Sequence, residues 1–186
     1  MIGYAFCGSF CTLSHSLAAL RQLCAEGYDV LPIMSEKVYE TDTRFWRAED
    51  FVNTVRSLCK KDVIHTIVDA EPLGPSIILD ALVISPCTGN TIAKIAQGIT
   101  DSCVTMAAKA HLRCDRTTLI SLASNDAMSA NLSNIASLLL RKNVYFVPMR
   151  QDDPEKKPHS LVADFTQLPE CLEYAIKGRQ HTPLFL

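Results

Sequence analysis

The feature that most constrains the fold is a regular alternation of short apolar runs with segments of helical periodicity. The run Ala81–Ser85 is almost wholly apolar, as expected for a strand buried on both faces of a parallel sheet. Nearer the start, Ile2–Phe6 is followed by apolar residues at helical spacing, and this pattern stops at Gly27. The alternation indicates βαβ units, and so an α/β fold of the Rossmann-like (flavodoxin-like) class, a parallel sheet with helices on both faces.

The same pattern predicts about five or six strands with helices between them. The predicted strands are Ile2–Phe6, Asp29–Met34, Val63–Val68, Ala81–Ser85, Thr117–Ala123 and Val144–Pro148. The predicted helices are 13–26, Glu49–Cys59, Thr91–Gly98, Val104–Leu112, Ala130–Lys142 and Leu168–Lys177. A polar connection covers Ser35–Thr43, and a charged surface excursion covers Gln151–His159. A chain of 186 residues suits one domain, so we expect a single domain over 1–186 with the excursion and closing helix at about 150–186.

Composition excludes several classes of function. The formal net charge is -2 and the charges are well mixed, so nucleic acid is not the expected partner. The longest apolar runs are too short or too charged to span a bilayer, and no Lys or Arg precedes Arg21, which argues against a signal peptide. A chain with 48% hydrophobic residues can fold without disulfides, so its eight cysteines are expected to be reduced thiols in the cytoplasm. Their spacing predicts no metal site.

Two turns of the predicted sheet could bind an anion, because ligands of such sheets lie beyond the carboxyl ends of the strands. The first turn contains Gly8, which permits a close backbone approach, and Ser9, whose hydroxyl lies beside the free N–H groups of a helix start. Ser35 follows the second strand in the same way. An ordinary helix cap explains each feature equally well, so neither alone identifies a ligand.

A third turn is more specific. Pro86 ends the buried strand, Thr88–Asn90 forms a polar loop, and a helix then runs to Gly98. This span resembles the flavoprotein family of homo-oligomeric, FMN-containing cysteine decarboxylases. The residues that match the family motif in register are Pro86, Thr88, Asn90, Thr91, Lys94, Gly98 and Asp101, whereas Ser85 and Gly89 stand in place of small alanines.

The resemblance implies an FMN site and an assembly of subunits, a trimer or larger. The implied cofactor contacts are Gly8, Ser9, Ser35, Pro86, Thr88, Gly89, Asn90 and Thr91. The sequence departs from the family pattern at two positions that matter for cysteine decarboxylation. Pro72 occupies the register of the family's active-site histidine, and only Ala123 and Asn125 survive from its Pro-Ala-Met-Asn motif. Cysteine decarboxylation is therefore an alternative rather than the expected activity.

A second resemblance, to the family of B subunits of dipicolinate synthases, covers nearly the whole chain. It rests on the segments Thr41–Phe45, Ala70–Pro75, Met106–Ala110, Asn125–Ala127, Gln151–Pro154 and Lys156–Pro158. It implies a partner A subunit that binds NAD(P), and the joint oxidation of a dihydrodipicolinate-type precursor to dipicolinate. It also implies a place in the cytoplasm of the mother cell of a spore-forming bacterium. A non-catalytic role as an assembly partner of the dehydrogenase subunit is the further alternative.

A dicarboxylate substrate needs cationic or amide partners. Arg44, Lys94 and Lys109 are candidates because their side chains bind carboxylates, and Asn125 is a candidate by its motif position. We interpret Cys87 as a packed thiol and His15 as a surface or structural residue.

Overall fold

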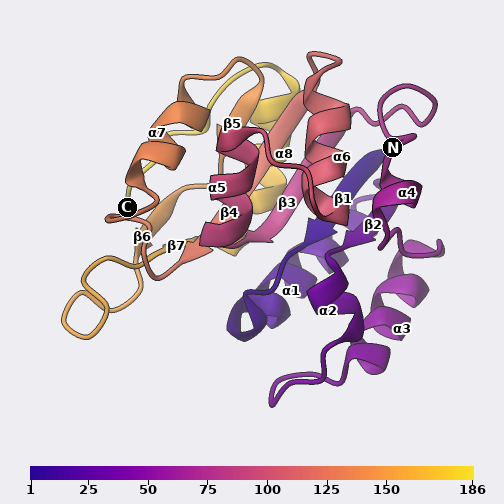
Figure 1. Ribbon diagram of the computed structural model, residues 1–186, viewed down its shortest axis with the longest axis horizontal. Coiled ribbons are helices and arrows are strands. Elements are labelled where there is room, and N and C mark those ends of the chain that lie inside the picture. Colours follow the sequence, from indigo (N-terminus) through magenta and orange to yellow (C-terminus); the bar gives the residue numbers. More distant parts are fainter.

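Parallel strands form the centre of the structure, a computed structural model that describes residues 1–186 (Figure 1). In chain order they are β1 (Ile2–Phe6), β2 (Val30–Met34), β3 (Ala81–Cys87), β4 (Thr117–Ser124) and β5 (Val144–Phe146). Their spatial order is β2-β1-β3-β4-β5, and every neighbouring pair is parallel. The chain leaves β1 toward β2 and then crosses to β3 on the other side. The carboxyl ends of β1 and β3 therefore flank a topological switch point, where such sheets bind ligands.

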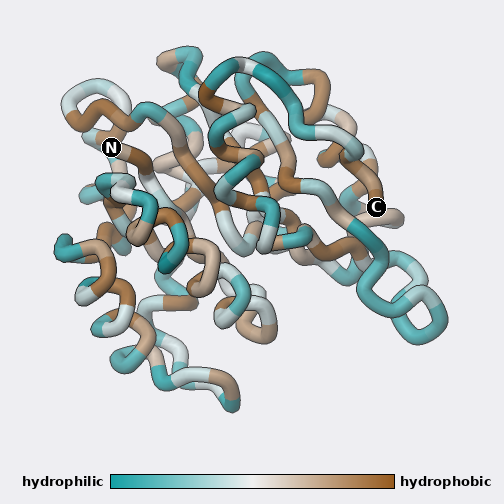
Figure 2. The backbone as a smooth tube through the Cα atoms, turned by 180° about the vertical axis from the view of Figure 1, so that it is seen from behind, coloured by the Kyte–Doolittle hydropathy of each residue, from teal (hydrophilic) through white to brown (hydrophobic).

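An antiparallel hairpin widens the sheet at only one end of β4. Its strands are β6 (Met149–Gln151) and β7 (Leu161–Ala163). β7 pairs with the last two residues of β4, whereas β5 pairs with residues 118–120 near its start. The loop between β6 and β7 is hydrophilic and projects from the body of the molecule (Figure 2). The hairpin thus stands beside the carboxyl edge, which is the edge of the predicted site.

Helices cover both faces of the sheet. They are α1 (Leu13–Ala25), α2 (Glu36–Glu40), α3 (Ala48–Cys59), α4 (Ile67–Ala70), α5 (Gly89–Gln97), α6 (Cys103–Leu112), α7 (Leu132–Leu139) and α8 (Leu168–Ile176), with short 3-10 helices η1 (Phe10–Thr12) and η2 (Phe165–Gln167). Side chains alternate along β1, so Tyr4 and Phe6 pack with α1, α3 and α8, whereas Ala5 and Cys7 pack with α5 and α6. The two buried clusters confirm the predicted α/β class.

Several details of the sequence prediction were wrong. The buried strand continues through Pro86 to Cys87, and the connection predicted over Ser35–Thr43 contains the helix α2. The segment Val63–Val68 is not a strand: only Ile64 bridges to β2, and the Thr66 side chain then accepts the N–H of Asp69 at the start of α4. The strand predicted over Val144–Pro148 ends at Phe146. The hairpin strands β6 and β7 were missed because three residues are too few to show an alternating pattern.

Candidate functional site

The loops that follow β1, β2 and β3 meet at one edge of the sheet because their strands are parallel. The Cys7 N–H donates to the carbonyl oxygen of Pro86 at 3.2 Å, which joins the first loop to the third. The Ser35 N–H donates to the carbonyl oxygen of Phe6 at 2.9 Å, which joins the second loop to the first. The predicted cofactor residues are therefore neighbours across these three loops.

The loop after β1 presents unused backbone donors. The Ser9 N–H bonds back to Cys7 at 2.8 Å, which makes a tight turn, but the N–H groups of Gly8, Phe10 and Cys11 donate to nothing in the chain. A Cβ atom added at Gly8 would meet nothing closer than 3.6 Å, so packing within the protein does not require a glycine here. Free N–H groups ahead of a helix can bind an anion.

Ser35 carries hydrogen-bonding capacity that the protein does not use. It is the N-cap residue of α2, yet its side chain caps nothing. Its Oγ atom is buried and has no hydrogen-bond partner. Buried polar atoms are rarely left in this state, and a bound ligand is one way in which such an atom is satisfied. The side chain is thus not explained as a helix cap.

The loop after β3 is packed tightly against the end of β4. Thr88 caps α5, since its Oγ1 atom accepts the Thr91 N–H at 3.2 Å. A Cβ atom at Gly89 would lie 2.5 Å from Ser124 Oγ and 2.6 Å from Asp126 Oδ1, so a larger residue here would require these side chains to move. Asn90 is exposed and its side chain forms no hydrogen bond. The sequence pattern indicates neither Ser124 nor Asp126 as part of this wall, because their contact with Gly89 depends on the pairing of β3 with β4.

A buried hydrogen-bond network connects α1 to the strands that lead into these loops. The Tyr4 hydroxyl donates to the carbonyl oxygen of Ser16 at 2.9 Å, and Ser16 Oγ donates to the carbonyl oxygen of Ser85 at 2.7 Å. All three residues are fully buried. Burial raises the pKa of Tyr4, so its phenol stays protonated and acts as a donor. The network holds α1 to the strand end that leads into the third loop.

Comparison with known proteins identifies the family of this chain. A family model described as Flavoprotein matches residues 2–167. The chain belongs to the flavoprotein family. It is 40% identical over its full length, and over 92% of the relative, to the B subunit of dipicolinate synthase of Bacillus subtilis.

Two solved structures share the fold of this chain. The crystal structure of the B subunit of dipicolinate synthase from Bacillus halodurans superposes with a TM-score of 0.91 at 38% identity, covering 100% of this chain and 95% of that one. The FMN-dependent cysteine decarboxylase SpaF superposes with a TM-score of 0.67 at 20% identity, covering 94% of this chain and 95% of that one. The second likeness is one of fold alone.

The thiols of this flavoprotein-family chain are all free, and most are buried. Burial raises the pKa of Cys7 to about 11 and raises the pKa of Cys87 well above its ordinary value, so both stay protonated. Cys11, in the loop after β1, is the exposed one. No cluster of His, Cys, Asp or Glu is arranged to hold a metal ion. None of the helices combines the length and apolar character needed to cross a membrane.

The structure brings only some of the predicted substrate residues to the carboxyl edge. Asn125 lies there, exposed in the turn after β4. Arg44 lies in the exposed loop between α2 and α3, with its guanidinium 4.8 Å from the centre of the Phe45 ring. Lys109 lies on α6, where it lines a small cavity of about 120 Å³ together with Gly98 and Ile99 at the end of α5. Lys109 is thus placed at the opposite end of α5 from the loop that carries Thr88 and Gly89.

Proposed function

We propose that this protein binds FMN at the loops after β1, β2 and β3 and acts as the flavin subunit of a dipicolinate synthase. In this role it would oxidise a dihydrodipicolinate-type precursor together with an NAD(P)-binding A subunit, in the mother-cell cytoplasm of a spore-forming bacterium. One observation carries the proposal. The unused N–H groups around Gly8 and the buried, unpartnered Ser35 Oγ lie on neighbouring loops of one edge.

These groups fit the phosphate of a mononucleotide. The N–H groups of Gly8, Phe10 and Cys11 and the hydroxyl of Ser35 would donate to its oxygens. Ser9 has a hydroxyl in the same loop, where its Oγ accepts from Thr12 at 2.9 Å. A bound flavin would supply the capacity to accept a hydride.

The loop after β3 would form the second wall of the cofactor site. Thr88 and Thr91 hold the start of α5 in place, and this leaves the Asn90 side chain free to bond a polar edge of the flavin. Gly89 lets this wall approach the end of β4 closely enough to place Asn125 at the same edge. Asn125 would hold the substrate together with Arg44, whose exposed loop would come from the same or a neighbouring subunit of a homo-oligomer.

The names of the relatives support this function over cysteine decarboxylation. The relative that matches at 40% identity is a subunit of dipicolinate synthase, and its match covers the whole chain. The decarboxylase shares only the fold, and Pro72 cannot act as a base where that family has a histidine.

The test begins with reconstitution of the purified protein with FMN, read by visible absorbance. Gly8→Asp places a carboxylate in the anion site and should abolish binding, and Asn90→Ala should weaken it. Ser137→Asp adds the same charge on the exposed side of α7 and is the matched control. A protein that never takes up FMN refutes the proposal.

Synthase activity with the A subunit then separates the alternatives. Loss of activity in Gly8→Asp supports a flavin that acts in the reaction. Full activity in that variant, despite its loss of FMN, would instead establish a non-catalytic assembly role. Release of carbon dioxide from a cysteinyl peptide would favour the decarboxylase.

A further inference from the structure

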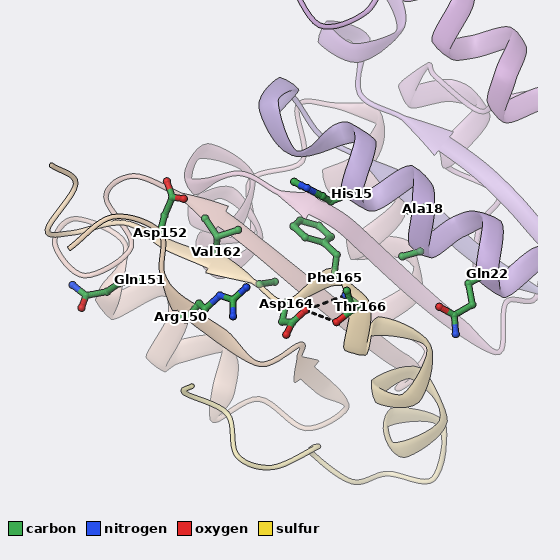
Figure 3. A pocket seen from close by; sticks show the side chains of 12 residues that line it. His15, Ala18, Gln22, Arg150, Gln151, Asp152, Val162, Asp164, Phe165 and Thr166 are labelled. Atoms are coloured by element: carbon green, nitrogen blue, oxygen red, sulfur yellow. Dashed lines mark hydrogen bonds between the residues drawn. The ribbon is translucent and has the colours of Figure 1, made fainter. Parts of the chain in front are cut away.

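A groove of about 500 Å³ runs between α1 and the β6–β7 hairpin, outside the proposed cofactor loops. Figure 3 shows His15 and Gln22 of α1 on one side and Arg150, Phe165 and Thr166 on the other. Its volume is within the range of small-molecule sites. Its residues lie outside the proposed cofactor loops, and the sequence assigns a role to none of them except His15, which is interpreted as a surface or structural residue.

The groove has an aromatic lining drawn from two elements. The imidazole of His15 stacks on the ring of Phe165, with the ring centres 6.1 Å apart and the planes 25° from parallel. Phe165 is 6% exposed, so its ring is fixed, whereas His15 is exposed and free to move aside. A fixed aromatic face beside a movable one suits a flat ring as ligand.

Arg150 is the charged side chain of the groove without a partner. It is exposed on β6, and its guanidinium forms neither an ion pair nor a hydrogen bond. The two carboxylates of the groove are already engaged. Asp164 accepts from Thr166 Oγ1 at 2.6 Å and from Gln167 Nε2 at 3.0 Å, and Asp152 pairs with Lys157. The Thr166 hydroxyl, and to a lesser extent the nearby charge of Arg150, lower the pKa of Asp164. No hydrogen bond uses the donors of Arg150, and their planar fork matches a carboxylate.

The groove adjoins the edge that carries the proposed cofactor site. His15 lies one helical turn after Thr12, whose hydroxyl bonds to Ser9 at 2.9 Å. On the other side, Val162 of β7 pairs with Ala123 of β4. A ligand in the groove would thus lie next to both the phosphate loop and the end of β4.

We propose that this groove binds a flat, ring-containing carboxylate, with the carboxylate on Arg150 and the ring against Phe165 and His15. The specific choice of a pyridine dicarboxylate rests on the proposed function. The shape and charge of the groove do not depend on it.

The experiment is a calorimetric titration with three probes. Dipicolinate and benzene-1,3-dicarboxylate both carry two carboxylates on a flat ring, and both should bind. Pyridine lacks the carboxylates and should not bind. Arg150→Gln should weaken binding of both dicarboxylates at least tenfold, and His15→Ala should weaken it several-fold. Arg21→Gln removes an exposed cation of α1 that does not line the groove, and it should leave binding unchanged.

Amide chemical shifts recorded during the titration give the location. They should move in α1, β6 and η2. Movement instead around Lys109, in the small cavity at the end of α5, or equal binding by Arg150→Gln and the parent protein, would overturn the proposal, as would the absence of binding by either dicarboxylate. FMN uptake is measured on the same samples and should survive Arg150→Gln. If the protein binds dicarboxylates but takes up no FMN, the proposed function is refuted and the groove assignment stands. If the protein takes up FMN but binds no dicarboxylate, the groove assignment is refuted and the proposed function stands.

Discussion

Ser16 Oγ donates to the carbonyl oxygen of Ser85 at 2.7 Å, and so ties the first turns of α1 to the end of β3. The two residues are 69 positions apart in the chain and both are fully buried. The loop that follows Ser85 therefore has its position set in part by a helix that begins after a different loop.

Ser16→Ala should lower the free energy of unfolding by about 1–3 kcal/mol, because it leaves the Ser85 carbonyl oxygen buried without this donor. Urea unfolding measures the change. Ser133→Ala, on the exposed side of α7 and without a side-chain hydrogen bond, should stay within about 0.5 kcal/mol of the parent. Equal stability of the two variants would show that the buried network contributes little.

Gly89→Ala should destabilise the protein by about 1–3 kcal/mol, because the new methyl group would overlap Ser124 and Asp126. Gly8→Ala meets no atom closer than 3.6 Å and should change the melting temperature much less. Thermal unfolding of the pair checks this. A larger loss in Gly8→Ala than in Gly89→Ala would contradict the described packing.

Ser35→Ala should leave the stability of the protein without cofactor nearly unchanged, because the Ser35 Oγ atom bonds to no other group of the chain. Its FMN dissociation constant should rise by about tenfold or more, as expected for loss of a hydrogen bond to a charged phosphate. Flavin fluorescence titration measures the constant. The exposed Ser137→Ala is the control, and unchanged FMN affinity in Ser35→Ala would remove Ser35 from the site.

Stability in acid should depend on Asp126. The hydrogen bond from Ser124 holds the pKa of Asp126 below its ordinary value, with a smaller contribution from Asn131. A carboxyl whose folded pKa is lowered stabilises the fold above the unfolded-state pKa of about 4, and this contribution is lost as the pH falls through the folded value. Asp126→Asn should therefore flatten the decline of unfolding free energy below about pH 5.

Urea unfolding across this pH range measures the slope. Asp62→Asn changes a carboxylate whose side chain is 96% exposed, and it should leave the slope as it is in the parent. If Asp126→Asn declines with pH as steeply as the parent, the Ser124 hydrogen bond does not stabilise the carboxylate.

The central fold follows from local patterns. The strand 81–85 and the helix after Ile2–Phe6 show clear periods, and parallel order follows from their alternation. The hairpin does not follow, because β6 and β7 are three residues each and are stabilised by pairing with β4. The segment Val63–Val68 shows the opposite error: its β-branched residues favour a strand, but no neighbouring strand pairs with it beyond Ile64.

Part of the candidate site could likewise be predicted from the sequence, and part could not. Gly8, Ser35 and Asn90 could be predicted because each follows a strand, and parallel strands bring such residues to one edge. Arg150 and Phe165 could not be predicted as neighbours of His15, because their positions depend on the hairpin and on the packing of η2 against α1.

Most of the cysteines in this chain are shielded, and this makes the exception useful as a labelling site. Buried thiols with raised pKa react slowly with alkylating dyes. Cys11 is exposed, and its N–H is one of the three unused donors beside Gly8. A dye attached there would report on the occupancy of the proposed FMN phosphate site in the unaltered sequence.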